Sequence, residues 1–332
     1  MDAMALYEEA CAHENALSGF YNRNVRVESG SGPVLVRIPG PGAEPMDLTL
    51  WPEPDVLEAI RPYVTRAPRL VHAGVDPVFQ IHEFIEGRRV DEIAQDRKPL
   101  PDLVLDGVEQ FFAEVLAVPA AALGAAPADW PGDGDTRGFA RLVLGFARGL
   151  RDRADASTNA LYRALGVPDD PCGLLLERAD VELVQRPFRL LHGDVHRKNM
   201  ILSDGAGLVV LDWELALWGD PVYDLADHLH KTAYTASDRA RVIAGWERAA
   251  PVDCRAGAAA GLAFYLGCEE MKSALVDTVR WGRRIAAAEV DRERRVLAEE
   301  LRAKLLAAGE HWVGGPTPDA AEIEEAVLRL LG

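Results

Sequence analysis

His192, Asp194, His196, Asn199 and Asp212 lie close together in the segment HGDVHRKNMILSDGAGLVVLDWE, residues 192–214. Asp194 and Asn199 follow the short apolar run FRLL, and Asp212 follows the run LVVL. Carboxylate and amide oxygens suit Mg²⁺, which binds through few protein groups together with water and phosphates. A carboxylate that the metal leaves free can accept the proton of a hydroxyl nucleophile. The segment therefore carries the groups needed for phosphoryl transfer.

Each of these residues also has a simpler explanation, because Asp, Asn and Gly are common turn formers. The combination is harder to explain in this way. The pattern H-G-D-x-H-x-x-N precedes an apolar strand and D-W-E, and the block GDPVYDLA follows at residues 219–226. Together these features favour a functional site over a turn.

Two other metal sites can be excluded from the residue types. His192 and His196 are four apart, as in a zinc-binding H-E-x-x-H helix, but Gly193 stands where that motif has Glu. The triplet from Asp194 to His196 is similar to the D-x-H of binuclear metallophosphatases, yet the chain has no G-N-H triplet. His228 and His230 are two apart on an expected helix, so they face different ways and are predicted not to be ligands.

Charge and composition limit the class of partner. The 332 residues carry a net charge of −17, with 48% hydrophobic and 27% charged residues, as in an ordinary globular protein. So acidic a chain is expected to bind neither nucleic acid nor an anionic membrane, and it would suit a cationic small molecule. The four cysteines are scattered, the first residues do not form a signal peptide, and the apolar windows are too short to span a bilayer. We therefore expect a cytoplasmic protein.

The pattern of apolar residues changes along the chain. Up to about residue 85, alternating or β-branched runs predict strands, with one helix in PEPDVLEAIRPYV. Beyond Gly87 the spacing of apolar residues predicts mainly helices. Short apolar runs in 188–211 interrupt them, and we expect FRLL and LVVL to lie together in one β-hairpin unit that carries the polar cluster.

The motifs HGDVHRKN, LDWE and GDPVYDLA resemble those of the aminoglycoside phosphotransferase family, a branch of the protein-kinase-like fold that includes choline, homoserine and fructosamine kinases. The resemblance covers about residues 15–235. It implies an α+β, bilobal, protein-kinase-like fold. The nucleotide-binding lobe would be β-rich and span residues 1–85, and the mainly helical lobe, with the catalytic loop and the acceptor pocket, would span residues 86–332. It also implies Mg²⁺ as cofactor and ATP or GTP as co-substrate.

The resemblance assigns roles in the polar cluster. Asp194 matches the catalytic aspartate, and Asn199 and Asp212 match the metal ligands. His196 falls where many protein kinases have Lys, so Arg197 or Lys198 is expected to supply positive charge near the phosphate. The residues expected to support the site from behind are His192, His196, Asp220 and Asp224.

The resemblance also assigns residues to nucleotide binding. Arg37 stands where a protein kinase has its phosphate-binding lysine, and because arginine can grip phosphate as a fork, nucleotide binding is still expected. Its predicted partner is Glu53. The alternative is that Arg37 is a solvent-facing strand residue. The remaining predicted nucleotide-binding residues are Gly19 and Asn22 in the covering loop, and Glu83, Phe84 and Ile85 in the hinge.

The expected function is therefore Mg²⁺-dependent O-phosphorylation of a small molecule, most readily an antibiotic such as an aminoglycoside or a nucleoside. Glu269, Glu270 and Asp277 are predicted to meet a cationic acceptor, although each could instead be a solvated charge on a helix. A second hypothesis is a housekeeping kinase for choline, homoserine or a sugar. A third is a catalytically inactive kinase-like binding module, supported by Arg37 and by the few glycines in the covering loop.

Overall fold

The computed structural model describes residues 2–13, 17–18, 22–40 and 49–332. These residues form two compact units, each built from two segments of the chain. The first unit comprises residues 1–128 and 189–252, and the second comprises residues 129–188 and 253–332. The expected lobe boundary after residue 85 falls inside the first unit and stays a prediction.

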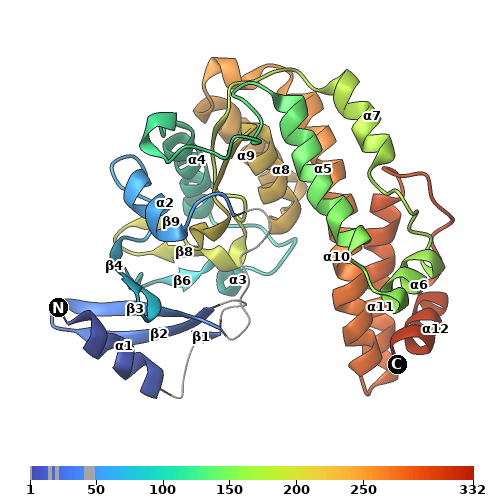
Figure 1. Ribbon diagram of the computed structural model, residues 1–332, viewed down its shortest axis with the longest axis horizontal. Coiled ribbons are helices and arrows are strands. Elements are labelled where there is room, and N and C mark those ends of the chain that lie inside the picture. Colours follow the sequence, from blue (N-terminus) through green and yellow to red (C-terminus); the bar gives the residue numbers. More distant parts are fainter. Residues whose placement is uncertain (1, 14–16, 19–21, 41–48) are drawn as a thin grey trace. The chain divides into compact units, whose positions relative to one another are not determined.

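The N-terminal part of the first unit is an antiparallel sheet of five strands in the order β1-β2-β3-β5-β4 (Figure 1). Its strands fall where the sequence predicts them, and the helix α2 (Glu53–Ile60) lies in the predicted helical segment. The strands are β1 (Leu17–Ser18), β2 (Asn22–Ser29), β3 (Gly32–Pro39), β4 (Leu70–Val75) and β5 (Val78–Glu83).

Helix α1 (Ala3–Ala12) packs on one face of this sheet, as Figure 1 shows. Their common core is apolar, and successive side chains of a strand point to opposite faces. Val34 and Val36 of β3 therefore face this core, and Arg37 faces the other side of the sheet. The buried core residues are Leu6, Ala10, Val25, Val27, Val34, Val36, Phe79 and Ile81.

The rest of the first unit combines two small sheets with helices. One sheet has the order β6-β8-β9, and the other pairs β7 with β10. The expected hairpin from MIL through the turn SDGAG to LVVL is formed by β8 and β9, whereas FRLL contributes β7, which pairs with the unpredicted strand β10. The strands are β6 (Arg88–Arg89), β7 (Arg189–Leu191), β8 (Met200–Ser203), β9 (Gly207–Val210) and β10 (Leu217–Gly219). The helices are α3 (Val90–Ile93), α4 (Asp102–Leu116), α8 (Pro221–Thr232) and α9 (Ala236–Ala249).

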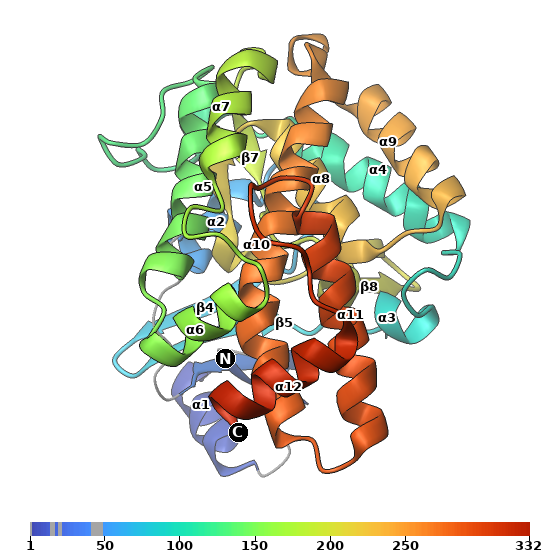
Figure 2. The ribbon, with the colours of Figure 1, turned by 90° about the vertical axis from the view of Figure 1, so that its right-hand side faces the viewer.

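The second unit is helical, and the long helix α10 (Ala258–Ala287) is its centre (Figure 2). Helices α5, α6, α7, α11 and α12 all pack against α10 or against one another. No helix in the described part of the chain is both long and apolar enough to cross a membrane. The other helices are α5 (Thr136–Asp152), α6 (Ala156–Ala164), α7 (Gly173–Glu182), α11 (Asp291–Ala308) and α12 (Ala320–Leu331).

Candidate active site

A tight loop between β7 and β8 carries the candidate catalytic residue in the first unit. Its backbone bends at Gly193, which has a φ of +77°. A side chain would be strained in this conformation, and a Cβ at this position would lie 2.7 Å from the carbonyl oxygen of Leu215. Glycine is therefore needed for the bend that presents Asp194.

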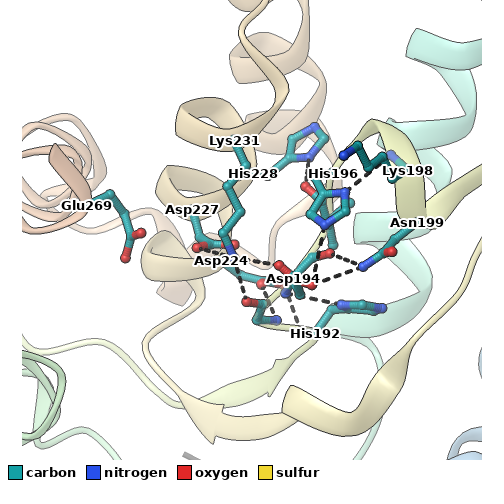
Figure 3. Close-up of polar contacts among 12 residues, drawn as sticks. His192, Asp194, His196, Lys198, Asn199, Asp224, Asp227, His228, Lys231 and Glu269 are labelled. Atoms are coloured by element: carbon teal, nitrogen blue, oxygen red, sulfur yellow. Dashed lines mark hydrogen bonds and ion pairs between the residues drawn. The ribbon is translucent and has the colours of Figure 1, made fainter. Parts of the chain in front are cut away.

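Three side chains surround the carboxylate of Asp194 (Figure 3). Asn199 Nδ2 donates to Oδ2 at 3.0 Å, and Lys231 Nζ donates to Oδ1 at 2.6 Å. His196 Nε2 lies 3.4 Å from Oδ2. Burial would raise the pKa of Asp194, but the hydrogen bond to His196 and the positive charge of Lys231 hold this pKa well below its usual range. The carboxylate is thus ionised at neutral pH, and its side chain remains 23% exposed.

Helix α8 holds the backbone of this loop. The carboxylate of Asp224 accepts hydrogen bonds from the backbone N–H of His192 at 3.0 Å and from that of Gly193 at 2.8 Å. Burial raises the pKa of Asp224 to about 6, although these two hydrogen bonds act in the opposite direction. Asp220 caps the start of α8, where its side chain accepts from the backbone N–H of Val222 at 3.1 Å. These contacts suit the supporting role that the GDPVYDLA motif implies.

His192 connects the loop to the segment that contains Asp212. Its Nδ1 accepts from the backbone N–H of Asp194 at 3.2 Å, so Nε2 carries the proton and donates to the carbonyl of Leu211 at 3.1 Å. Burial lowers the pKa of His192 to about 4, which keeps the ring neutral and preserves this pattern. His196 also accepts through Nδ1, from the backbone N–H of Lys198 at 3.2 Å, which leaves its Nε2–H for Asp194.

His228 supports the loop from α8. Its Nδ1 lies 2.9 Å from the carbonyl oxygen of Val195, and its Nε2 lies 2.7 Å from the hydroxyl of Tyr234. Nδ1 therefore donates to this carbonyl, and in the neutral ring Nε2 accepts from the hydroxyl. Burial lowers the pKa of His228 to about 4. The ring is thus a fixed part of the loop support.

We expect the free energy of unfolding to decrease as the pH falls from about 6.5 toward 4, because the folded-state pKa of His228 lies below its value of 6.5 in an unfolded chain. The unfolded chain binds the extra proton in this window, so this contribution is complete above pH 6.5 and is lost below it. One such histidine gives a slope of up to about 1.4 kcal/mol per pH unit. Urea unfolding of the wild type, His228→Gln and the exposed control His13→Gln measures the slope. An equal slope in wild type and His228→Gln would contradict this assignment.

The two candidate metal ligands come to the same end of the β8–β9 hairpin. Met200 of β8 is paired with Val210 of β9, and the backbone N–H of Leu211 donates to the carbonyl of Asn199 at 2.7 Å. Asn199 directly precedes β8 and Asp212 follows β9, so this register places an amide and a carboxylate side by side. The described residues contain no group of three or more His, Cys, Asp or Glu side chains that could hold a metal ion. Asn199 and Asp212 fit the other type of Mg²⁺ site, in which phosphate and water complete the shell.

Arg37 and Glu53 fix the segment around Asp212. The backbone of Asp212 is left-handed, with φ of 69° and ψ of 69°, which is uncommon for a residue other than glycine. Arg37 Nη2 donates to Asp212 Oδ1 at 2.8 Å, and the backbone N–H of Trp213 donates to Glu53 Oε1 at 3.0 Å. The predicted ion pair is present, since Arg37 Nη1 lies 2.9 Å from Glu53 Oε1. The alternative of a solvent-facing Arg37 is wrong, because its side chain is only 8% exposed.

In this group, burial and the neighbouring charges shift the pKa values of Arg37 and Glu53 in opposite directions. Burial lowers the pKa of Arg37, but the charges of Glu53 and Asp212 raise it well above its usual value. Burial raises the pKa of Glu53, whereas Arg37 lowers it. Glu214 lies 3.9 Å from Arg37 Nη2, and burial together with the charge of Asp212 raises its pKa to about 7. Glu214 was not among the predicted site residues, although its place in LDWE, two residues after Asp212, was a signal.

The other predicted nucleotide-binding residues belong to the covering loop and to the hinge. Gly19 lies outside the described residues. Asn22 Nδ2 lies 3.5 Å from Glu214 Oε2, which brings β2 to the Asp212 segment. In the hinge, Glu83 forms an ion pair with Arg69, the guanidinium of Arg26 lies 5.1 Å from the ring centroid of Phe84, and Ile85 is half-buried. Their role in holding the purine stays a prediction.

The three predicted acceptor-binding carboxylates lie on α10 in the second unit. Each has a partner within that unit. Glu269 forms an ion pair with Lys272 at 2.6 Å, and Asp277 forms one with Lys304 at 2.8 Å. Glu270 Oε2 lies 2.7 Å from His311 Nε2. Glu269 and Asp277 are buried, so they are not the solvated charges of the alternative explanation, and their contact with an acceptor stays a prediction.

The positive charge at Asp194 comes from an unpredicted residue. The predicted Arg197 is buried and donates to the backbone carbonyls of Ala94, Gln95, Thr232 and Ala233, so it anchors the end of α8. The predicted Lys198 is exposed. The ammonium that contacts the Asp194 carboxylate belongs to Lys231. Helical spacing from Asp224 was a possible signal, because residues 224, 228 and 231 share one face of a helix.

The sequence and the fold were compared with known proteins. Residues 14–260 match the profile of the phosphotransferase enzyme family. None of the curated proteins in the comparison matches the chain.

Several solved structures of phosphotransferases are similar in fold. A choline/ethanolamine kinase family protein from Mesorhizobium loti has a TM-score of 0.60 at 14% identity, covering 99% of this chain and 100% of that one. The macrolide 2′-phosphotransferase MphH from Brachybacterium faecium has a TM-score of 0.54 at 17% identity, covering 90% and 97%. A thermostable mutant of the aminoglycoside phosphotransferase APH(4)-Ia, in complex with AMP-PNP and hygromycin B, has a TM-score of 0.54 at 15% identity, covering 88% and 93%. This likeness shows the predicted α+β, kinase-like fold.

Proposed function

Because the chain belongs to the phosphotransferase enzyme family, whose members transfer phosphate to hydroxyl groups of small molecules, we propose that it phosphorylates a polar antibiotic. The phosphoryl donor would be ATP or GTP, and the cofactor would be Mg²⁺. The acceptor would be an aminoglycoside or another polar, hydroxylated compound such as a nucleoside.

One observation carries the proposal. Asp194, which is ionised and partly exposed, is hydrogen-bonded to Asn199, and the β8–β9 register brings Asn199 next to the segment of Asp212. The proposed proton acceptor thus lies beside the end of the β8–β9 hairpin that would supply the two oxygen ligands. Phosphoryl transfer needs mainly this kind of positioning and charge neutralisation.

In the proposed reaction, Asp194 orients the acceptor hydroxyl and takes its proton as the new bond to phosphorus forms. A carboxylate with a low pKa suffices, because the transition state is loose and the proton leaves late. Asn199 and Asp212 would hold the Mg²⁺, which when bound neutralises the phosphate oxygens. Arg37, fixed by Glu53, places a permanent positive charge beside Asp212. This charge supports nucleotide binding at a position where kinases have lysine.

Net charge and fold both bear on the class of acceptor. The net charge of −17 favours an acceptor that carries positive charge, as aminoglycosides do. Structures with the same fold include one with hygromycin B bound and others named as choline or ethanolamine kinases. The fold itself is compatible with either class, because the acceptor pocket decides specificity.

Mass spectrometry of an acceptor panel tests the proposal. The protein would be incubated with Mg²⁺ and ATP or GTP, together with aminoglycosides, nucleoside antibiotics, macrolides, choline, ethanolamine, homoserine and sugars. We expect an antibiotic to gain the mass of one phosphoryl group. A product on choline, homoserine or a sugar, with all antibiotics unchanged, would instead assign a metabolite kinase. Nucleotide binding that does not depend on Mg²⁺, with no product at all, would favour the binding module.

A further inference from the structure

Lys231 places an ammonium group directly at the candidate catalytic carboxylate. Its Nζ lies 2.6 Å from Asp194 Oδ1 and 3.3 Å from the carbonyl oxygen of Gly193 (Figure 3). The side chain is 26% exposed, so it is not sealed inside the protein. An incoming hydroxyl or phosphoryl oxygen at Asp194 would therefore meet this charge as well.

The position of this ammonium is fixed by its own helix. Asp227, one turn earlier on α8, is fully buried, and its Oδ1 lies 2.9 Å from Lys231 Nζ. The same face of α8 holds the loop through Asp224 and His228. The end of the helix is anchored by Arg197, which donates to the carbonyl of Thr232 at 2.8 Å. The helix that holds the loop thus also fixes the position of Lys231. Electrostatic catalysis requires charges that are preorganised in this way.

The neighbouring cations occupy other places. Arg37 is bound to Glu53 and Asp212, on the metal side of the site. Arg197 is committed to backbone carbonyls, and His196 uses Nδ1 to accept from the backbone N–H of Lys198. Among the described contacts, Lys231 is therefore the lysine or arginine whose charge contacts the Asp194 carboxylate. This carboxylate would face the acceptor.

We propose that Lys231 is a catalytic residue that neutralises the transferring phosphoryl group on the acceptor side. This role rests on the proposed function. The acceptor oxygen forms a bond to the γ-phosphorus while the bond from this phosphorus to the β,γ-bridging oxygen breaks, and the nucleoside diphosphate leaves with the electron pair. The hydroxyl proton passes to Asp194. As Asp194 loses its negative charge, the ammonium of Lys231, which Asp227 still holds, pairs with a phosphoryl oxygen. The structural alternative is that Lys231 only compensates the buried charge of Asp227.

Four variants separate these two roles: Lys231→Met, Lys231→Arg, the double variant Asp227→Asn/Lys231→Met, and Lys98→Met as a control that removes an exposed lysine from the same unit. Each assay contains Mg²⁺ and either ATP or GTP. The acceptor is either the best one of the panel or water alone. Transfer is followed as nucleoside diphosphate released, and nucleotide binding as the thermal shift that Mg²⁺ and nucleotide produce.

We expect Lys231→Met to lower kcat by about 10²-fold, the usual effect of removing one transition-state charge partner, with an unchanged nucleotide-induced thermal shift. Lys231→Arg should retain most of the rate and Lys98→Met all of it. The double variant should be as slow as Lys231→Met, although no buried charge is left uncompensated. A double variant that regains the wild-type rate, or a Lys231→Met variant with wild-type kcat, would overturn the catalytic role. A wild type that consumes neither nucleotide would overturn the proposed function itself, and the role of Lys231 with it.

Discussion

Asp194→Asn is expected to lower kcat for phosphoryl transfer by about 10³-fold while nucleotide affinity stays nearly unchanged. Asparagine has the same shape as aspartate, but it cannot accept the proton of the acceptor hydroxyl, and general-base catalysis typically contributes between about 10² and 10⁴. It also removes the charge that faces Lys231, which lies 2.6 Å away. The nucleotide should still bind, because Arg37, Glu53 and Asp212 contact one another without Asp194.

Initial rates with the acceptor found in the panel, together with the nucleotide-induced thermal shift, measure both parts of this prediction. Asp204→Asn is a matched control, since it is the same substitution at an exposed position in the β8–β9 turn. Equal turnover in Asp194→Asn and Asp204→Asn would show that the proton acceptor is another residue.

Asp212→Asn is expected to remove most of the Mg²⁺-dependent stabilisation by nucleotide. Neutral asparagine is a poorer ligand for a hard divalent cation than a carboxylate, and we expect affinity for the metal–nucleotide complex to fall by about 10²-fold. At a ligand concentration of about 100 times Kd, binding stabilises the wild type by about 2.7 kcal/mol, whereas a variant with about 100-fold weaker binding gains about 0.4 kcal/mol. The difference corresponds to several degrees in Tm.

Thermal unfolding should be recorded for each protein with and without nucleotide, in Mg²⁺ and in EDTA. The shift on adding nucleotide is compared rather than the Tm itself, because Asp212→Asn also removes a partner of Arg37. We expect a large shift in Mg²⁺ for wild type and Asp204→Asn, and a small one for Asp212→Asn. The same Mg²⁺-dependent shift in Asp212→Asn would mean that this carboxylate does not hold the metal.

Periodicity and motif were enough to predict the fold class and most elements near the site. The alternation in β2 and the helical spacing in α4 reflect burial on one face, which a sequence shows directly. Strand pairing was harder to predict. Strand β10 has only the three residues LWG, with no local pattern of its own, and it takes β7 as its partner because of packing between distant segments.

The candidate site shows the same limit. Asp194, Asn199 and Asp212 lie within one motif, so their types and spacing were enough to predict phosphoryl-transfer chemistry. Lys231 is 37 residues from Asp194 in the chain, and its side chain reaches the carboxylate only because α8 packs under the loop. Arg197 is closer in sequence but points to the end of α8. Sequence distance alone therefore does not show which cation contacts Asp194.

Phosphorus NMR of nucleotide consumption tests the central claim most directly, because it detects transfer of the γ-phosphate to any acceptor, including water. Wild type and Asp194→Asn would each be incubated with Mg²⁺, ATP or GTP and the pooled acceptors. The account predicts that the γ-phosphate signal of one nucleotide declines with the wild type, that diphosphate and a new phosphate signal grow in equal amounts, and that Asp194→Asn leaves the nucleotide almost intact. Unchanged nucleotide with the wild type, or equal consumption by both proteins, would contradict the assignment of this cluster as a phosphoryl-transfer site.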